Sequence, residues 1–176
     1  MKNIFQTILI FIFIITLSYQ GSAQPGFLDP TFGNNGIVVE NRLGYPVGLA
    51  NLADGKILVP GGLGPYFYMD RFNPDGSNDQ SFGIDGRAIL NLENRYSVCY
   101  CMALQQDGKI VLVGSFDATD DPAYLDIAIV RCNPDGVLDS SFGINGLTTV
   151  NLSNYDYAYD VAIQPDGKIV IIGNFT

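Results

Sequence analysis

Asn73–Gly86 reads NPDGSNDQSFGIDG, and Asn133–Gly146 reads NPDGVLDSSFGING, nearly the same stretch sixty positions further along the chain. An Asn-Pro-Asp-Gly sequence favours a type I β-turn that begins at Asn and ends at Gly. Repetition at such a period is typical of solenoids and propellers, in which each unit buries its apolar face against its neighbours. The sequence therefore predicts a repeat protein.

Three motifs recur in a fixed order. They are D-x-[ST]-F-G-x-x-G, D-G-K followed by an apolar run, and R-x-N-P-D-G. We expect the glycines to adopt conformations closed to other residues and each phenylalanine to anchor its loop in the core. The motif residues are Phe32, Gly33, Gly36, Phe82, Gly83, Gly86, Phe142, Gly143 and Gly146 for the first motif, Asp54, Gly55, Asp107, Gly108, Asp166 and Gly167 for the second, and Arg71 and Arg131 for the third.

Short apolar segments of strand length separate the motifs, and no segment after the N-terminus has helical periodicity. The sequence predicts an all-β fold of propeller-like repeats, each a four-stranded antiparallel blade, with about two and two-thirds units forming an incomplete ring. The D-G-K turns are expected to be two-residue type I′ hairpins, because Asp-Gly favours positive φ at both central positions. The lysines that follow, Lys56, Lys109 and Lys168, are expected to point to solvent.

The N-terminus has the features of a secretory signal peptide. Lys2 is followed by the apolar run Ile8–Leu17, and Gly21-Ser22-Ala23 offers small residues for cleavage. The run is too short for a membrane span, which needs about 20 residues. We expect residues 1–23 to be removed and the chain to be secreted or held at the cell surface. The remaining units are predicted at 24–81, which is atypical, 82–141, and a truncated 142–176.

The quoted F-G-x-x-G, Q-x-D-G-K-I and R-x-N-P-D-G elements resemble the delta-60 repeat family, β-propeller-like repeats of secreted and cell-surface bacterial proteins. The likeness covers essentially all of Phe27–Thr176. It implies the fold and the location of the protein, and it implies no defined activity and no catalytic residue.

Composition excludes several functions. The chain contains 9 basic and 18 acidic residues, a net charge of −9, which disfavours binding to nucleic acid or to anionic membranes. It contains no histidine, so it lacks the commonest general base, the usual nucleophile pairs and every histidine-containing zinc site. Hydrophobic residues make up 47% of the chain, so its acidity does not indicate disorder.

The repeated aspartates fit turn positions, where they cap backbone amides. A weak calcium site is the alternative for one acidic loop, since calcium prefers several convergent oxygens. That loop contains Asp117, Asp120, Asp121 and Asp126. Otherwise no cofactor, metal or catalytic residue is expected.

Arg71 and Arg131 each precede an aspartate by eight residues, Asp79 and Asp139. We interpret these as ion pairs that clamp the loop, with a ligand-binding arginine as the alternative. Tyr155, Tyr157 and Tyr159 stand at alternate positions, which favours packing between strands over stacking on sugars.

Two hypotheses of function follow. The preferred one is a non-enzymatic binding, adhesion or scaffold module with a protein or glycan ligand, completed by further repeat units or by self-association. The alternative is an extracellular polysaccharide hydrolase that uses paired aspartates. Because the motifs recur once per unit, they favour a structural role over a single active site. The three thiols are expected to be free, with Cys99 and Cys101 on one face of a strand and Cys132 two strands away.

Overall fold

In the computed structural model, residues 26–93, 95–119 and 124–176 are described. Their strands form three antiparallel sheets, with no helix among them. The expected signal peptide, residues 1–23, lies outside the described residues. Within the described part of the chain, no helix is long and apolar enough to cross a membrane.

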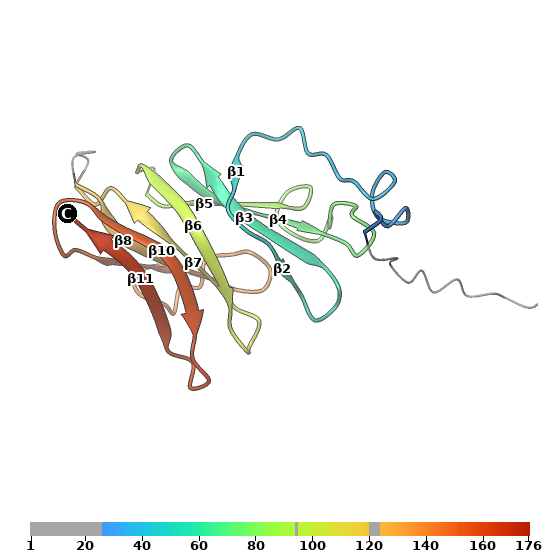
Figure 1. Cartoon of the computed structure of the whole chain (residues 1–176). Coiled ribbons are helices and arrows are strands. Elements are labelled where there is room, and N and C mark those ends of the chain that lie inside the picture. Colours follow the sequence, from blue (N-terminus) through green and yellow to red (C-terminus); the bar gives the residue numbers. More distant parts are fainter. Residues whose placement is uncertain (1–25, 94, 120–123) are drawn as a thin grey trace, which may run out of the picture.

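The three sheets stack in chain order (Figure 1). The first contains β1 (Tyr45–Pro46), β2 (Ala50–Asn51), β3 (Ile57–Leu63), β4 (Tyr66–Phe72) and β5 (Arg87–Asn91). The second contains β6 (Ser97–Leu104), β7 (Ile110–Phe116), β8 (Asp126–Cys132) and β9 (Leu147–Val150), and the third contains β10 (Asp156–Ile163) and β11 (Ile169–Phe175). The predicted all-β fold of antiparallel sheets is confirmed. The described sheets do not close into a barrel.

A sheet does not coincide with a unit of the sequence repeat. β5 and β9, which follow the F-G-x-x-G loops, pair with β4 and β8 of the preceding unit. The order in the second sheet is β6-β7-β8-β9, so the last strand comes from the unit that begins at residue 142. The first and second sheets are thus each linked to the next repeat by main-chain hydrogen bonds.

The D-G-K hairpins differ from the predicted type I′ turns. Gly108 N donates to Gln105 O at 3.0 Å, and Gln105 N donates to Lys109 O at 2.8 Å. Gly108 has φ of 81°, whereas Asp107 is absent from the residues with positive φ. This is a three-residue loop with a type I turn and a glycine bulge. The type I′ prediction is wrong, because Asp107 does not have the positive φ that this turn requires. Its carboxylate instead accepts a hydrogen bond from Lys109 N at 3.1 Å.

The core lies between the sheets. One cluster, which includes Phe67, Phe82 and Leu112, fills the space between the first and second sheets. A second cluster, which includes Val111, Val113 and Ala158, lies between the second and third. β7 is buried along its whole length, because its alternating side chains face both neighbouring sheets.

A β-bulge corrects the expected placement of the cysteines. Cys99 pairs with Gly114, and Cys101 pairs with the adjacent Val113, so Tyr100 is the inserted residue. The insertion turns the two thiols to opposite faces: Cys99 joins the first core cluster, while Cys101 packs against the second. The three cysteines are free, as predicted.

The outer face of the first sheet carries polar side chains at positions whose equivalents in the second sheet are apolar. Tyr68, Asp70 and Arg87 occupy the positions that the repeat equates with Ala128, Val130 and Leu147. Arg87 donates to both oxygens of Asp70, at 2.6 and 2.5 Å, and stacks on the Tyr68 ring at 4.2 Å. An apolar neighbouring sheet would leave these charges without water, so this face suits the end of a stack.

The chain itself covers part of this polar face. Arg87 Nη1 donates to Leu43 O at 2.7 Å, and Arg42 Nη2 donates to Asp85 O at the same distance. Gly44 lies against Tyr68, and a Cβ placed on Gly44 would come within 2.5 Å of the ring. The segment around residues 42–44 therefore caps the first sheet.

Candidate binding surface

The R-x-N-P-D-G and D-x-[ST]-F motifs meet in a clamp that occurs twice. Arg71 Nε lies 2.6 Å from Asp79 Oδ2, and Arg131 Nε lies 2.8 Å from Asp139 Oδ2. The guanidinium of Arg71 also lies 4.3 Å from the Phe82 ring centre. The predicted ion pairs are therefore present. In each arginine, Nε is bonded to the carboxylate of its own loop.

The lysines of the D-G-K turns complete the clamp, contrary to the solvent-facing prediction. Lys56 Nζ lies 2.9 Å from Asp79, and Lys109 Nζ lies 3.0 Å from Asp139. Sequence reasoning missed these contacts because the partners are 23 and 30 residues apart and meet only when the hairpin lies beside the loop. Lys168, whose side chain is 74% exposed, matches the prediction.

Electrostatics hold the clamp aspartates ionised. Hydrogen bonds from the Ser141 hydroxyl and from Lys109 hold the pKa of Asp139 well below its usual range. Burial by itself would raise the pKa of Asp79, but bonds from Ser81, Lys56 and Arg71 outweigh it and lower the pKa strongly. A general acid of a glycosidase needs a raised pKa. These two carboxylates are therefore suited to structure rather than to proton donation.

The motif phenylalanines differ in burial. Phe82 is fully buried and packs against Gly136 of the next turn, where an added Cβ would lie 2.6 Å from the ring. Phe32 occupies the same place on Gly76, and a Cβ there would lie 3.2 Å from its ring. Phe32 and Phe142 are half-buried. Phe82, in the loop before β5, therefore joins the first sheet to the turn that follows β8 in the second sheet.

The acidic loop shows no calcium geometry in its described part. Asp120 and Asp121 lie outside the described residues. Asp117 and Asp126 are buried, and they accept hydrogen bonds from Thr119 N and from Asn151 Nδ2. Across residues 26–93, 95–119 and 124–176, no group of three or more acidic or thiol side chains could hold a metal ion.

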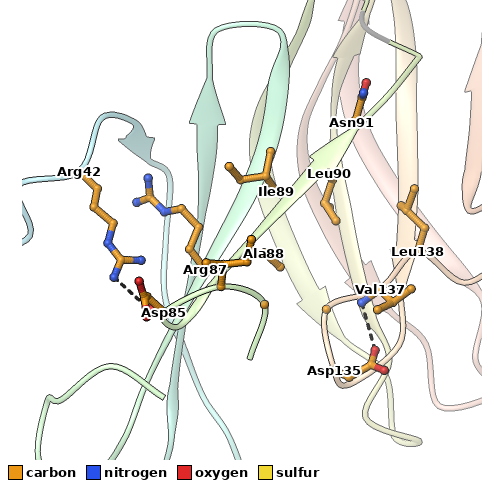
Figure 2. A pocket seen from close by; sticks show the side chains of 13 residues that line it. Arg42, Asp85, Arg87, Ala88, Ile89, Leu90, Asn91, Asp135, Val137 and Leu138 are labelled. Carbon is orange, nitrogen blue, oxygen red and sulfur yellow. Dashed lines mark hydrogen bonds between the residues drawn. The ribbon is translucent and has the colours of Figure 1, made fainter. Parts of the chain in front are cut away.

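A cavity of about 920 Å³ lies between β5 and the turn that follows β8 (Figure 2). Its wall includes the exposed side chains of Ile84, Ile89 and Val137. Three of its charged side chains bond to the protein: Arg42 to Asp85 O, Arg87 to Asp70, and Asp135 to Val137 N at 3.0 Å. The groove is thus mainly apolar, with charged residues among its lining.

Tyrosines gather on the first strands of the second and third sheets. The ring centres of Tyr157 and Tyr159 lie 6.3 Å apart in a stacked arrangement. Tyr100 meets both edge-on, at 6.4 and 6.0 Å. Tyr159 is 51% exposed, and its hydroxyl donates to Asn174 Oδ1 at 3.0 Å. The predicted packing between strands is present, and it leaves an aromatic face open to solvent.

β-bulges place two of these tyrosines. Tyr100 and Tyr159 are the inserted residues at equivalent positions of β6 and β10. Bulges often occur near functional sites, where they redirect a side chain. Sequence reasoning did not include Tyr100, because a bulge depends on strand pairing that alternation along one strand does not reveal.

The aromatic surface continues towards the first sheet. A cavity of about 340 Å³ is lined by Tyr45, Tyr96 and Tyr100, together with backbone around Gly62 and Gly64. Tyr45 is 81% exposed and Tyr96 is 50% exposed. We call Tyr45, Tyr96, Tyr100, Tyr157 and Tyr159 together the tyrosine surface. Concave sites with aromatic walls and few polar groups are typical of ligand binding.

The antiparallel sheets and the motif-built joints between them define a propeller-type repeat protein. Residues 52–82, 105–142 and 164–176 match a family described as "Domain of unknown function (DUF5122) beta-propeller". The first two matched segments each contain the lysine, arginine, aspartate and phenylalanine of a clamp. Comparison with curated proteins and with solved structures found no match.

Proposed function

We propose that the chain is a non-enzymatic binding module of the delta-60 repeat type, and that the tyrosine surface binds carbohydrate. The observation that carries this proposal is the open cluster of Tyr100, Tyr157 and Tyr159 beside the Asn174 amide. Tyrosine rings offer an apolar face and a hydroxyl at low conformational cost, and an amide can both donate and accept hydrogen bonds. Sugar rings present CH faces and hydroxyl groups that complement both.

A glycan array with the full chain tests the proposal. We expect binding to a subset of glycans, and we expect Tyr159→Ala to weaken it about tenfold, since a stacked ring contributes roughly 1 kcal/mol or more. Tyr124, which is 42% exposed and lies outside the tyrosine surface, is the matched control. Binding that Tyr124→Ala weakens as much as Tyr159→Ala would contradict the proposal, as would the absence of any glycan binding.

The hydrolase hypothesis has less support, because the lowered pKa values of Asp79 and Asp139 oppose a general-acid role. We expect no release of reducing sugar from any polysaccharide that the array identifies. Release that Asp79→Asn or Asp139→Asn abolishes in a folded variant would restore the hydrolase hypothesis.

Secretion or surface display is part of the proposal, and it rests on the signal-like sequence of residues 1–23. N-terminal sequencing of protein recovered from outside the producing cell should begin at Gln24. Recovery in the cell with Met1 or Lys2 retained would contradict the proposed location.

A further inference from the structure

The cavity of about 340 Å³ beside Tyr100 lies where the first sheet packs against the second. The first sheet contributes Tyr45 and Val47, together with Gly62 of β3 and Gly64 of the turn that follows it. The second sheet contributes residues 96–100. None of the described lining residues comes from β10 or β11, so two neighbouring sheets are sufficient to form the cavity.

Two glycines open this cavity. Counted from the D-G-K turns, Gly62 is equivalent to Ser115, and Gly64 is equivalent to Asp117. Ser115 and Asp117 are buried, so side chains fill both places where the second sheet meets the third. A Cβ added to Gly62 would lie 3.7 Å from the main-chain nitrogen of Cys99, which belongs to the opposite wall. The space that two side chains would take between the first and second sheets is therefore part of the cavity.

The cavity has a closed floor and an open mouth. Cys99 is 1% exposed and belongs to the first core cluster, and the buried Ser97 donates a hydrogen bond of 2.7 Å to Pro65 O. Tyr45 and Tyr96, by contrast, are largely exposed and border the opening. A pit that is closed at one end can receive the end of a chain, whereas a chain that passes through needs a groove open at both ends.

The lining selects against charge. Among the described residues that line the cavity, none has a charged side chain, and three are tyrosines. A charged ligand group would lose its hydration there without gaining a counterion. The net charge of −9 on the chain also repels anions before they arrive. Tyrosine rings and hydroxyl groups suit an uncharged ligand that has apolar faces and hydroxyls of its own.

We propose that this cavity holds one terminal sugar residue of an uncharged glycan, and that the next residues of the glycan lie along Tyr100. The inference rests on the proposed carbohydrate binding, to which it adds the charge of the glycan and the part that is bound. Ligand pockets usually measure roughly 300–1,000 Å³. A cavity of about 340 Å³ is at the small end of this range, which fits a single ring. The chain thus recognises glycan ends rather than the middle of a polysaccharide.

Filling the cavity tests its role. Gly62 is not among the glycines with positive φ, so a side chain there adds no backbone strain. The probe is the tightest-binding hexasaccharide among neutral oligomers of glucose, mannose and xylose. We expect Gly62→Leu to weaken its binding to the full chain at least tenfold in calorimetric titration. Gly48→Leu is the matched control, since Gly48 also lacks positive φ and an added Cβ there meets nothing within 4 Å.

A second variant keeps the test valid if Gly62→Leu does not fold. Tyr96 is 50% exposed at the mouth of the cavity, so its truncation leaves the core intact. We expect Tyr96→Ala to weaken binding of the same hexasaccharide about fivefold to tenfold. Binding that neither Tyr96→Ala nor a folded Gly62→Leu variant weakens overturns the inference.

Ligand charge and chain length test the rest of the inference. We expect a hexasaccharide of galacturonate to bind at least tenfold more weakly than the neutral probe. Titration with longer chains of the same linkage should give one protein per glycan chain at every length, because each chain has one matching end. Equal or tighter binding of the galacturonate oligomer overturns the inference, as does a number of bound proteins that rises with chain length.

The outcomes distinguish the cavity from the proposed function. Binding that Tyr159→Ala weakens, and that Gly62→Leu and Tyr96→Ala do not, overturns the cavity alone and leaves carbohydrate binding at the tyrosine surface. Binding that Gly62→Leu weakens, and that Tyr159→Ala does not, supports the cavity and places the site away from the third sheet. The absence of binding to every neutral oligosaccharide overturns the inference, and a glycan array without any signal contradicts the proposed function as well.

Discussion

Arg71 Nη1 donates a hydrogen bond of 2.8 Å to the carbonyl oxygen of Pro134, which lies 63 residues further along the chain. The same guanidinium pairs with Asp79 at 2.6 Å and lies against Phe82. One side chain thus links the strand of one unit to its own loop and to the turn of the next unit. The repeat motif is a joint between units as well as a turn.

Replacing this arginine should show the value of the joint. We expect Arg71→Ala to lower the free energy of unfolding by about 2–3 kcal/mol, because it leaves Asp79 with fewer partners and removes the bond to Pro134. Arg131→Ala is the matched control, since Arg131 makes the same local contacts without that bond. Its effect should be about 1 kcal/mol smaller in urea unfolding. Equal losses would show that the bond to Pro134 contributes nothing measurable.

Substitutions at two glycines distinguish the stability cost of a steric clash from the cost of backbone strain. Gly136 and Gly167 have nearly the same φ, 86° and 85°. An added Cβ at Gly136 would lie 2.6 Å from Phe82, and at Gly167 it would meet nothing within 4 Å. We expect Gly167→Ala to cost about 1 kcal/mol from strain alone, and Gly136→Ala to cost at least 1 kcal/mol more. Thermal unfolding of both variants measures the difference, and similar losses would contradict the packing argument.

Acid should weaken the clamps. Asp79 and Asp139 have native pKa values below those of the unfolded chain, so the native state binds fewer protons. Their stabilisation is complete above the unfolded value and is lost as the pH falls below about 4. Thermal unfolding between pH 7 and pH 2 should show this loss, and Asp139→Asn should reduce its steepness. An unchanged pH profile in a folded Asp139→Asn variant would show that the clamp aspartate does not drive the loss.

The cysteines should differ in reactivity. Burial raises the pKa of the Cys132 thiol to about 12 and raises that of Cys99 strongly. Burial, together with the bond to Asp160, also raises the pKa of Cys101, which is only half-buried. With iodoacetamide, mass spectrometry should find Cys101 labelled first, slowly, and all three labelled after unfolding. Rapid native labelling of Cys99 would contradict its burial.

Sequence alone determined the repeat, the all-β fold and the Asn-Pro-Asp-Gly turns, because these depend on local backbone preferences and on alternation along a strand. The spacing of Arg71 and Asp79 was also sufficient to predict their ion pair, since one loop joins them. Contacts between segments far apart in the chain, and irregularities of strand pairing, could not be predicted from it. Lys56 meets Asp79 only when a hairpin lies beside a loop, and Tyr100 is redirected only by a bulge in the pairing of β6 with β7.

The tertiary structure also determined how deeply each position of the repeat is buried. Val111 and Val170 occupy the same place in the repeat, yet one is fully buried and the other is 47% exposed. Similarly, the sequence alone does not distinguish Tyr68, Asp70 and Arg87 from other strand residues. The structure places them together on the outer face of the first sheet, beneath the segment around residues 42–44. A repeat specifies how one unit folds on itself. What lies across each face depends on the neighbouring sheet, because burial is a property of two packed surfaces and not of one strand.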